Sequence, residues 1–291
     1  MNRDDNAPVQ PVIVIGMHRS GTSMVTDVLE SLGLFSGVCR DPNEEAWFFL
    51  KLNDWLLEQS GGNWENPQPI RWLLGNPDIR LLAADYIRHV FRTPGIVSFL
   101  GWKRFLACRS LEAIGEPWGW KDPRNTFTLP LWLDLFPEAK VIHIFRHGVD
   151  VAQSLRTRQR AVSNPAAARA LFEQRKPLYY LRRKASGFIA HMRCASLEGG
   201  FSLWEEYMRE AQRHVQRLGV RAAEVRYEEF LERPVDHLRQ LAPFCGLSAT
   251  DAQIGQAAAR IDTSRAFAYR ADKELSAFAE SVHERLEAFG Y

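Results

Sequence analysis

Cysteine is scarce in this chain, and its spacing argues against the common cysteine-built sites. The four cysteines form no Cys-x-x-Cys pair and have no histidine at metal-ligand spacing; they are Cys39, Cys108, Cys194 and Cys245. A zinc site is therefore not expected, and neither is a disulfide framework in a chain of 291 residues. We interpret these residues as buried or incidental thiols of a protein in a reducing compartment.

Long apolar runs and a strong net charge are also missing. Residues 1–10 are polar and lack the apolar centre of a signal peptide. No run approaches the roughly 20 apolar residues that a membrane-spanning helix needs. The formal net charge of +2 gives no reason to expect a nucleic-acid partner. These absences predict a cytoplasmic protein without an integral membrane segment, and they leave its oligomeric state open.

The order of the elements predicts an α/β fold. Val12–Ile15 is a short β-branched run, typical of a buried parallel strand, and the turn Gly16–Gly21 leads from it into a helix that Gly33 should end. Further strands are predicted at 118–121, 140–145 and 224–227. We expect residues 1–10 to be a disordered lead-in. Residues 11–291 should form a single domain, a P-loop-like three-layer α/β/α fold around a central, mostly parallel sheet.

Two regions between these strands are harder to assign. Residues 44–112 hold aromatic-rich segments of helical character around a loop at 61–67, and residues 156–194 are strongly basic. The chain should close on one helix with an apolar stripe formed by Leu275, Phe278, Val282, Leu286 and Phe289.

The turn after the first strand has the pattern of a phosphate loop. Gly16–Ser23 fits GxxxxGK[ST] except that Thr22 stands where the lysine belongs. Backbone N–H groups of the turn and of the helix N-terminus still converge on an anion, and Thr22 and Ser23 add hydroxyl groups. The lysine that grips the β- and γ-phosphates of a nucleoside triphosphate is lost, and Arg19 lies three residues earlier.

The acid that would hold a magnesium ion is missing as well. P-loop nucleotide triphosphatases place this acid at the end of a later apolar strand. Here the strand at 141–145 runs into Arg146 instead. A cation in this position suits direct phosphate binding, so no metal is expected.

Four segments, whose order along the chain matches that of the family, resemble the sulfotransferases that use 3′-phosphoadenylyl sulfate. The string Gly16-Met-His-Arg-Ser-Gly-Thr-Ser23 resembles the 5′-phosphosulfate loop of that family. Phe145–Ser154 is similar to its 3′-phosphate motif, in which an arginine and a serine stand eight residues apart. Lys121-Asp-Pro-Arg124 is the third match, because many members carry a catalytic lysine 25 residues before that arginine. The fourth, Val225–Pro234, is similar to the stretch that closes the nucleotide site.

The resemblance implies a donor, a class of acceptor and a set of site residues. The donor, 3′-phosphoadenylyl sulfate, is a co-substrate, and the acceptor is a hydroxyl or amine of a small molecule or a glycan. The implied donor-binding residues are Arg19, Ser20, Gly21, Thr22, Ser23, Arg146, Ser154 and Tyr227. Arg19 and Lys121 are assigned to the bridging oxygen and the transferring group. Residues 46–112 and 156–203 match only loosely, and the family places acceptor specificity there, so we expect helical acceptor-binding insertions.

The general base is where the sequence departs from part of the family. Cytosolic hormone sulfotransferases carry a histidine two residues after the lysine, and here that position is Pro123. The branches that act on glycans or protein tyrosine, which this sequence resembles most in its Arg-Ser-Gly-Thr loop, draw a glutamate from the segment after the first helix. Glu44 and Glu45 occupy that segment, and Asp122 is the fallback.

Other residues near these motifs have less specific interpretations. His18 and His147 flank the phosphate loops and should help to shape the site. Five tryptophans suit either the core or a stacking surface for an acceptor; they are Trp55, Trp64, Trp72, Trp102 and Trp118. Two other functions stay open at this point, a P-loop kinase-like enzyme and a homologue that binds nucleotide or glycan without catalysis.

Overall fold

The computed structural model describes residues 8–183 and 191–291. Most of the expected lead-in and part of the expected insertion at 156–203 therefore lie outside the described residues, as does the side chain of Cys108. The chain divides into two compact units. The first comprises the chain up to His147 together with Glu206–Phe267, and the second comprises Gly148–Glu205 and Ala268–Tyr291. A single domain over 11–291 stays a prediction.

A parallel sheet of four strands forms the centre of the first unit. The strands are β1 (Val12–Gly16), β2 (Gly119–Lys121), β3 (Lys140–Phe145) and β4 (Ala222–Arg226). Their order across the sheet is β2-β1-β3-β4, and all three pairings are parallel. The predicted mostly parallel sheet is confirmed. Because the strands are parallel, their carboxyl ends lie at one edge, which is where open α/β sheets bind ligands.

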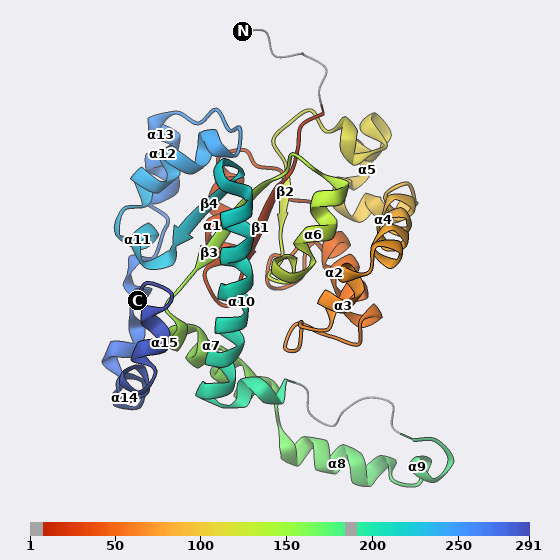
Figure 1. The fold of residues 1–291 in the computed structure, drawn as a ribbon, viewed down its shortest axis with the longest axis vertical. Coiled ribbons are helices and arrows are strands. Elements are labelled where there is room, and N and C mark those ends of the chain that lie inside the picture. The colour runs from red at the N-terminus through yellow and green to blue at the C-terminus, as the bar shows by residue number, and fades with distance from the viewer. Residues whose placement is uncertain (1–7, 184–190) are drawn as a thin grey trace. The chain divides into compact units, whose positions relative to one another are not determined.

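Helices cover both faces of this sheet, which confirms the three-layer architecture (Figure 1). On one face, alternate residues of β1 and β3 share a buried apolar cluster with α1 (Thr22–Ser31), α12 (Pro234–Phe244) and α13 (Asp251–Ala258). On the other face lie α2 (Trp47–Gln59) and α6 (Asn125–Leu135). There the ring of Phe49 stacks on Trp120 at 3.9 Å between centroids. All five residues of β1 are buried, so a continuous apolar run is what this strand requires.

The start and end of α1 agree with the sequence. Gly21 is the N-cap, and Gly33 adopts φ 110° just after the C-cap. Glycine favours this left-handed conformation because it has no Cβ, so Gly33 ends the helix as predicted.

The helices that the sequence indicated between residues 44 and 112 are present. The segments at 47–50 and 55–57 lie in α2, and the segment at 81–90 lies in α4 (Pro77–Phe91). The structure adds α3 (Ile70–Gly75) and α5 (Val97–Cys108), which the sequence did not indicate. The first unit is completed by α11 (Tyr227–Glu232) and by the residues of α10 (Leu197–Leu218) from Glu206 onward. Within residues 8–183 and 191–291, no helix combines the length and apolar character needed to cross a membrane.

The second unit has a small aromatic core. Its helices are α7 (Gly148–Val162), α8 (Pro165–Arg175), α9 (Leu178–Leu181), the first part of α10, α14 (Lys273–Ser281) and α15 (His283–Glu287). Trp204 contacts Phe201 and Phe289 at ring distances of 5.1 and 5.0 Å. The prediction of one closing helix is wrong. Val282 is buried and separates α14 from α15, with φ −113° and ψ 16°. The spacing of an apolar stripe does not reveal such a break.

Candidate active site

The phosphate loop is held in a conformation that two glycines make possible. Gly16 has φ 142°, and a Cβ on it would lie 2.2 Å from the carbonyl oxygen of Ile144. Gly21 has φ 89°, and a Cβ there would lie 2.2 Å from the ring of Tyr227. Larger residues are therefore excluded at both positions. Between them Arg19 also adopts a left-handed backbone, with φ 71°, which is uncommon outside glycine and is a form of strain that clusters at functional sites.

The loop opens onto the N-terminus of α1, where N–H groups are available to an anion. The first turn of α1 contains no acidic residue, and no side chain caps it. The hydroxyl of Ser20 is buried, and within the described chain it has no hydrogen-bond partner. A buried hydroxyl group without a protein partner can donate to a bound anion or to water. Together with the positive end of the helix dipole, it fits a phosphate or sulfate group.

Lys121 ends β2 and reaches the first turn of α1. It is 2% exposed, and its Nζ donates to Ser23 Oγ at 3.2 Å and to the carbonyl oxygen of Asn43. The same Nζ lies 3.5 Å from Glu45 Oε1. The structure thus brings together a buried ammonium group, the phosphate loop and one of the two candidate bases.

A tight turn sends the two adjacent glutamates in different directions. The carboxylate of Asp41 accepts hydrogen bonds from the backbone N–H groups of Asn43 at 2.9 Å and Glu45 at 2.8 Å. Glu44, with φ 63°, is exposed and pairs with Arg40 at 3.3 Å. Glu45 is 2% exposed and faces Lys121. The structure therefore places Glu45, and not Glu44, beside the phosphate loop.

The surroundings of Glu45 raise the pKa of its carboxyl group to about 7. Burial is the largest cause, and the nearby charge of Asp122 adds to it. Lys121 and Arg124 act in the opposite direction. A carboxyl group balanced in this way exchanges a proton near neutral pH, which is what a general base requires.

Asp122 is bound into the scaffold instead. It is 1% exposed, and it accepts hydrogen bonds from Asn53 Nδ2 at 2.8 Å and from the backbone N–H of Arg124 at 2.9 Å. The guanidinium group of Arg124 lies 3.0 Å from Asp122 and 3.1 Å from Glu45, and it also pairs with Asp54 at 2.7 Å. Arg124 thus connects the candidate base to a fixed carboxylate behind it.

A second group of residues lies where β3 and β4 end. The guanidinium carbon of Arg146 stands 4.8 Å from the centre of the Tyr227 ring, and its Nη2 donates to the carbonyl oxygen of Arg265 at 3.0 Å. Burial raises the pKa of the Tyr227 phenol, although Arg146 opposes the shift. The ring of Tyr227 also covers Gly21, so this group and the phosphate loop are in contact.

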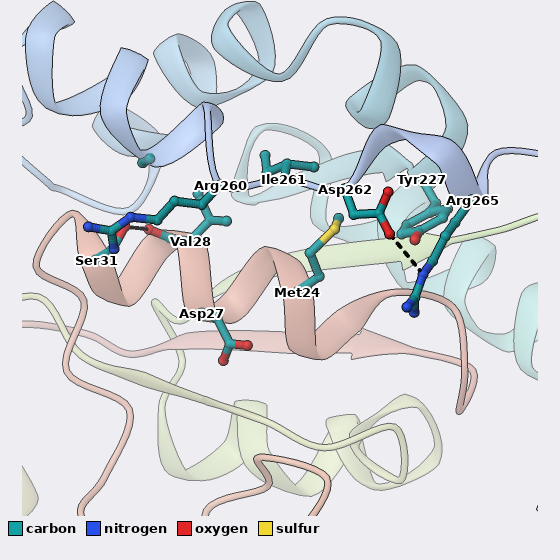
Figure 2. Close-up of a pocket in the computed structure, with 10 residues that line it drawn as sticks. Met24, Asp27, Val28, Ser31, Tyr227, Arg260, Ile261, Asp262 and Arg265 are labelled. Atoms are coloured by element: carbon teal, nitrogen blue, oxygen red, sulfur yellow. Dashed lines mark hydrogen bonds and ion pairs between the residues drawn. The ribbon is translucent and has the colours of Figure 1, made fainter.

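A cavity of about 440 Å³ lies along α1 next to Tyr227. Figure 2 shows Tyr227 and Arg265 at one end of it, with Met24 pointing in from α1. Arg265 pairs with Asp262 at 3.3 Å across this end. The volume falls within the range of small-molecule pockets, about 300–1,000 Å³.

Comparison with known proteins identifies the family of the chain. The model of a family described as the sulfotransferase family matches residues 11–251. The chain belongs to the sulfotransferase family. It is accordingly an enzyme of the class that transfers sulfuryl groups.

Solved structures show the same fold at low sequence identity. The sulfotransferase domain of the olefin synthase of Synechococcus PCC 7002 is 19% identical, with a TM-score of 0.53 over 100% of this chain and 98% of that one. The sulfotransferase domain of the curacin biosynthetic pathway is 17% identical, with a TM-score of 0.50 over 95% and 98%. No curated protein sequence matches the chain.

The other predicted residues of this sulfotransferase fall in different places. Ser154 lies on α7, in the second unit, so its pairing with Arg146 stays a prediction based on spacing. The ring of His18 packs against Trp64 at 4.7 Å, and the backbone N–H of His147 donates to Glu228 at 2.8 Å. Within the described chain, no three His, Cys, Asp or Glu side chains gather in a way that would hold a metal ion.

The five tryptophans divide between core and surface. Trp64 and Trp118 are buried, and Trp55 is partly buried against Tyr86. Trp72 and Trp102 are 86% and 68% exposed.

Three contributors to the site were not predicted as site residues. They are Arg124, the carbonyl group of Asn43, and Asp41, which shapes the turn. The Lys-Asp-Pro-Arg motif contains Arg124, and the Asp-Pro-Asn turn before Glu44 contains the other two. Both segments were noted in the sequence, but only the fold shows that the Lys-Asp-Pro-Arg motif and the Asp-Pro-Asn turn lie in contact.

Burial of Glu45 should make the stability of the protein depend on pH. Its pKa is raised from 4.5 to about 7 on folding, so its contribution to stability is fully present below about pH 4.5 and is lost as the pH rises through about 7. Glu45→Gln removes this titration. The free energy of unfolding of the variant, relative to wild type, should rise by about 2 kcal/mol between about pH 5 and about pH 8. Urea unfolding at both pH values measures this difference. If the free energy of unfolding depends on pH in the same way in both proteins, the raised pKa of Glu45 is contradicted.

Proposed function

We propose that this sulfotransferase moves a sulfuryl group from 3′-phosphoadenylyl sulfate to a hydroxyl or amine of its acceptor. The observation that carries the proposal is the buried pair of Lys121 and Glu45 next to the phosphate loop, with Nζ and Oε1 3.5 Å apart. Lys121 is the cation that would stabilise the transferring sulfuryl group. Glu45 is the carboxyl group, with a pKa of about 7, that would accept the acceptor's proton.

Two anion sites at one sheet edge support this donor. The 5′-phosphosulfate would bind the N–H groups of Gly21, Thr22 and Ser23, with the Ser20 hydroxyl and the Arg19 side chain. The 3′-phosphate would bind Arg146 through charge-assisted hydrogen bonds. The cavity beside Tyr227 and Arg265 would take the nucleoside between them.

The proposed reaction is a direct displacement at sulfur. The acceptor oxygen forms a bond to sulfur while the bond from sulfur to the 5′-phosphate oxygen breaks. The acceptor proton passes to Glu45, and adenosine 3′,5′-bisphosphate leaves. Lys121 and Arg19 stabilise the charge that develops on the transferring group and the bridging oxygen. Lys121 contacts Ser23, Asn43 and Glu45, and this fixed position supports the proposed role.

For the acceptor we propose a small molecule or a glycan, the latter because the loop and the glutamate resemble the branch of the family that acts on glycans. Exposed Trp72 and Trp102, on helices of the 46–112 region, offer faces on which a sugar ring can stack. The test is incubation with donor carrying labelled sulfur and a panel of glycans, lipids and phenols. Transfer of label to an acceptor is expected. Binding of ATP with Mg²⁺ but no transfer from the donor would favour a kinase-like enzyme instead.

The two anion sites predict which nucleotide binds. Adenosine 3′,5′-bisphosphate should bind without added metal, and AMP and ATP much more weakly. Arg146→Ala should remove most of this preference, because a hydrogen bond to a charged partner contributes about 1.5–3 kcal/mol. Arg239→Ala, at an exposed arginine of α12, is the matched control and should bind normally. Calorimetry that finds equal affinity for AMP and the bisphosphate in wild type would rule out two separate anion sites.

Lys121 should act on chemistry more than on binding. Lys121→Ala should lower kcat sharply and leave the affinity for adenosine 3′,5′-bisphosphate nearly unchanged, because the interaction is made mainly in the transition state. Steady-state kinetics and calorimetry on the same preparation separate the two effects. An unchanged kcat would show that the lysine takes no part in transfer.

The two glutamates should differ in their effect on turnover. Glu45→Gln should reduce kcat by about 10²–10⁴-fold, the usual loss of a general base, whereas Glu44→Gln should turn over normally. In wild type, kcat/KM should fall about tenfold per pH unit below about pH 7, because Glu45 must be ionised to accept a proton. Normal turnover by both variants would move the assignment to Asp122, or to an acceptor acidic enough to need no base.

A further inference from the structure

Residues 160–183 of the second unit lie within the region 156–203, where we expect an acceptor-binding insertion, and they form a basic surface segment with exposed apolar side chains. None of the residues assigned above to donor binding or sulfuryl transfer lies in this segment. We call it the basic arm. None of its residues is buried, and the helices α8 and α9, light green in Figure 1, bury no side chain at all. Most helices of globular proteins are stabilised by burying one face. A segment of this length without buried residues therefore has a surface available for a partner.

The charge of the protein is concentrated in this arm. It holds six basic residues, Arg160, Arg169, Arg175, Lys176, Arg182 and Arg183, and one acidic residue, Glu173. Its net charge is thus +5 in a chain whose net charge is +2, so the rest of the chain is net negative at −3. Lys176 pairs with Glu173 at 3.4 Å, and the arm offers no other acid to its arginines. An anionic partner fits this imbalance.

Large apolar side chains lie among these charges. Leu178 is 61% exposed, and Tyr180 and Leu181 are each 89% exposed, immediately before Arg182 and Arg183. Val162 and Leu171 add 65% and 42% exposed side chains. A soluble polyanion would bind the basic side chains but would not bury the exposed leucines. A lipid surface binds both, because aliphatic and tyrosine side chains enter the membrane interface while arginines contact the headgroups.

We propose that the basic arm binds the surface of a membrane that contains anionic lipids. Tyr180 and Leu181 enter the interface, and Arg175, Lys176, Arg182 and Arg183 contact the headgroups. The attachment is peripheral and reversible, since it depends on one short apolar turn and a few charges. This binding goes beyond the transfer reaction and does not require it.

The test is co-sedimentation of the full chain with vesicles of phosphatidylcholine, made with and without phosphatidylglycerol. Binding to the anionic vesicles is expected, with affinity at least about tenfold higher than for phosphatidylcholine alone and with loss of binding at high salt. Equal binding to both vesicles, or to neither, would overturn the proposal.

Two pairs of variants identify the arm as the contact. Arg175→Glu with Arg182→Glu should lower the affinity for anionic vesicles at least about tenfold, because each basic side chain near an anionic surface raises the binding affinity about fivefold. Its control is Arg88→Glu with Arg239→Glu, at exposed arginines of α4 and α12. Tyr180→Ser with Leu181→Ser should also weaken binding. Its control is Leu82→Ser with Val220→Ser, at positions 65% and 95% exposed in the first unit. Both controls should bind as wild type.

Two further measurements exclude other occupants. Light scattering without vesicles reports whether the arm instead joins two copies of the chain. A dimer that the arm variants dissociate, together with no vesicle binding, would overturn the proposal. So would tight binding of the arm to soluble heparin without binding to vesicles.

Thermal unfolding of every variant should stay cooperative, because none of the substituted side chains is buried.

Discussion

The burial of one carboxyl group against two cations is the interaction on which the candidate site depends. Glu45 lies 3.5 Å from Lys121 and 3.1 Å from Arg124, and its side chain is 3% exposed. Desolvation alone would keep it protonated, and the two cations alone would keep it ionised. The balance leaves its pKa at about 7. One feature thus supplies an ammonium group aimed at the phosphate loop and a carboxyl group able to exchange a proton.

Three features of the fold hold these groups in place. The parallel sheet brings the ends of β1 and β2 together, so that Lys121 reaches the loop that follows Gly16. The turn around Asp41 fixes which of two adjacent glutamates faces inward. Behind them Asn53 holds Asp122 at 2.8 Å, and Asp122 in turn holds Arg124. A hydrogen-bonded support of this kind is what keeps charged groups at fixed distances in a buried site.

The sequence predicted the elements that local chemistry determines. Val12–Ile15 forms a strand because it is apolar and β-branched, and Gly16, Gly21 and Gly33 mark turns that need glycine. The choice between Glu44 and Glu45 was out of reach, because adjacent residues of the same type differ only through the turn that Asp41 forms. The break at Val282 was missed for a similar reason, since an apolar stripe has the same spacing on a bent helix as on a straight one.

The account depends most on the ionisation of Glu45, which can be observed directly. Carbon-13 NMR of protein labelled at glutamate side chains, titrated with pH, follows each carboxyl group. We expect one resonance with a midpoint near 7, present in wild type and absent from Glu45→Gln. A wild-type titration in which every glutamate carboxyl ionises near its ordinary pKa of 4.5 would contradict the account.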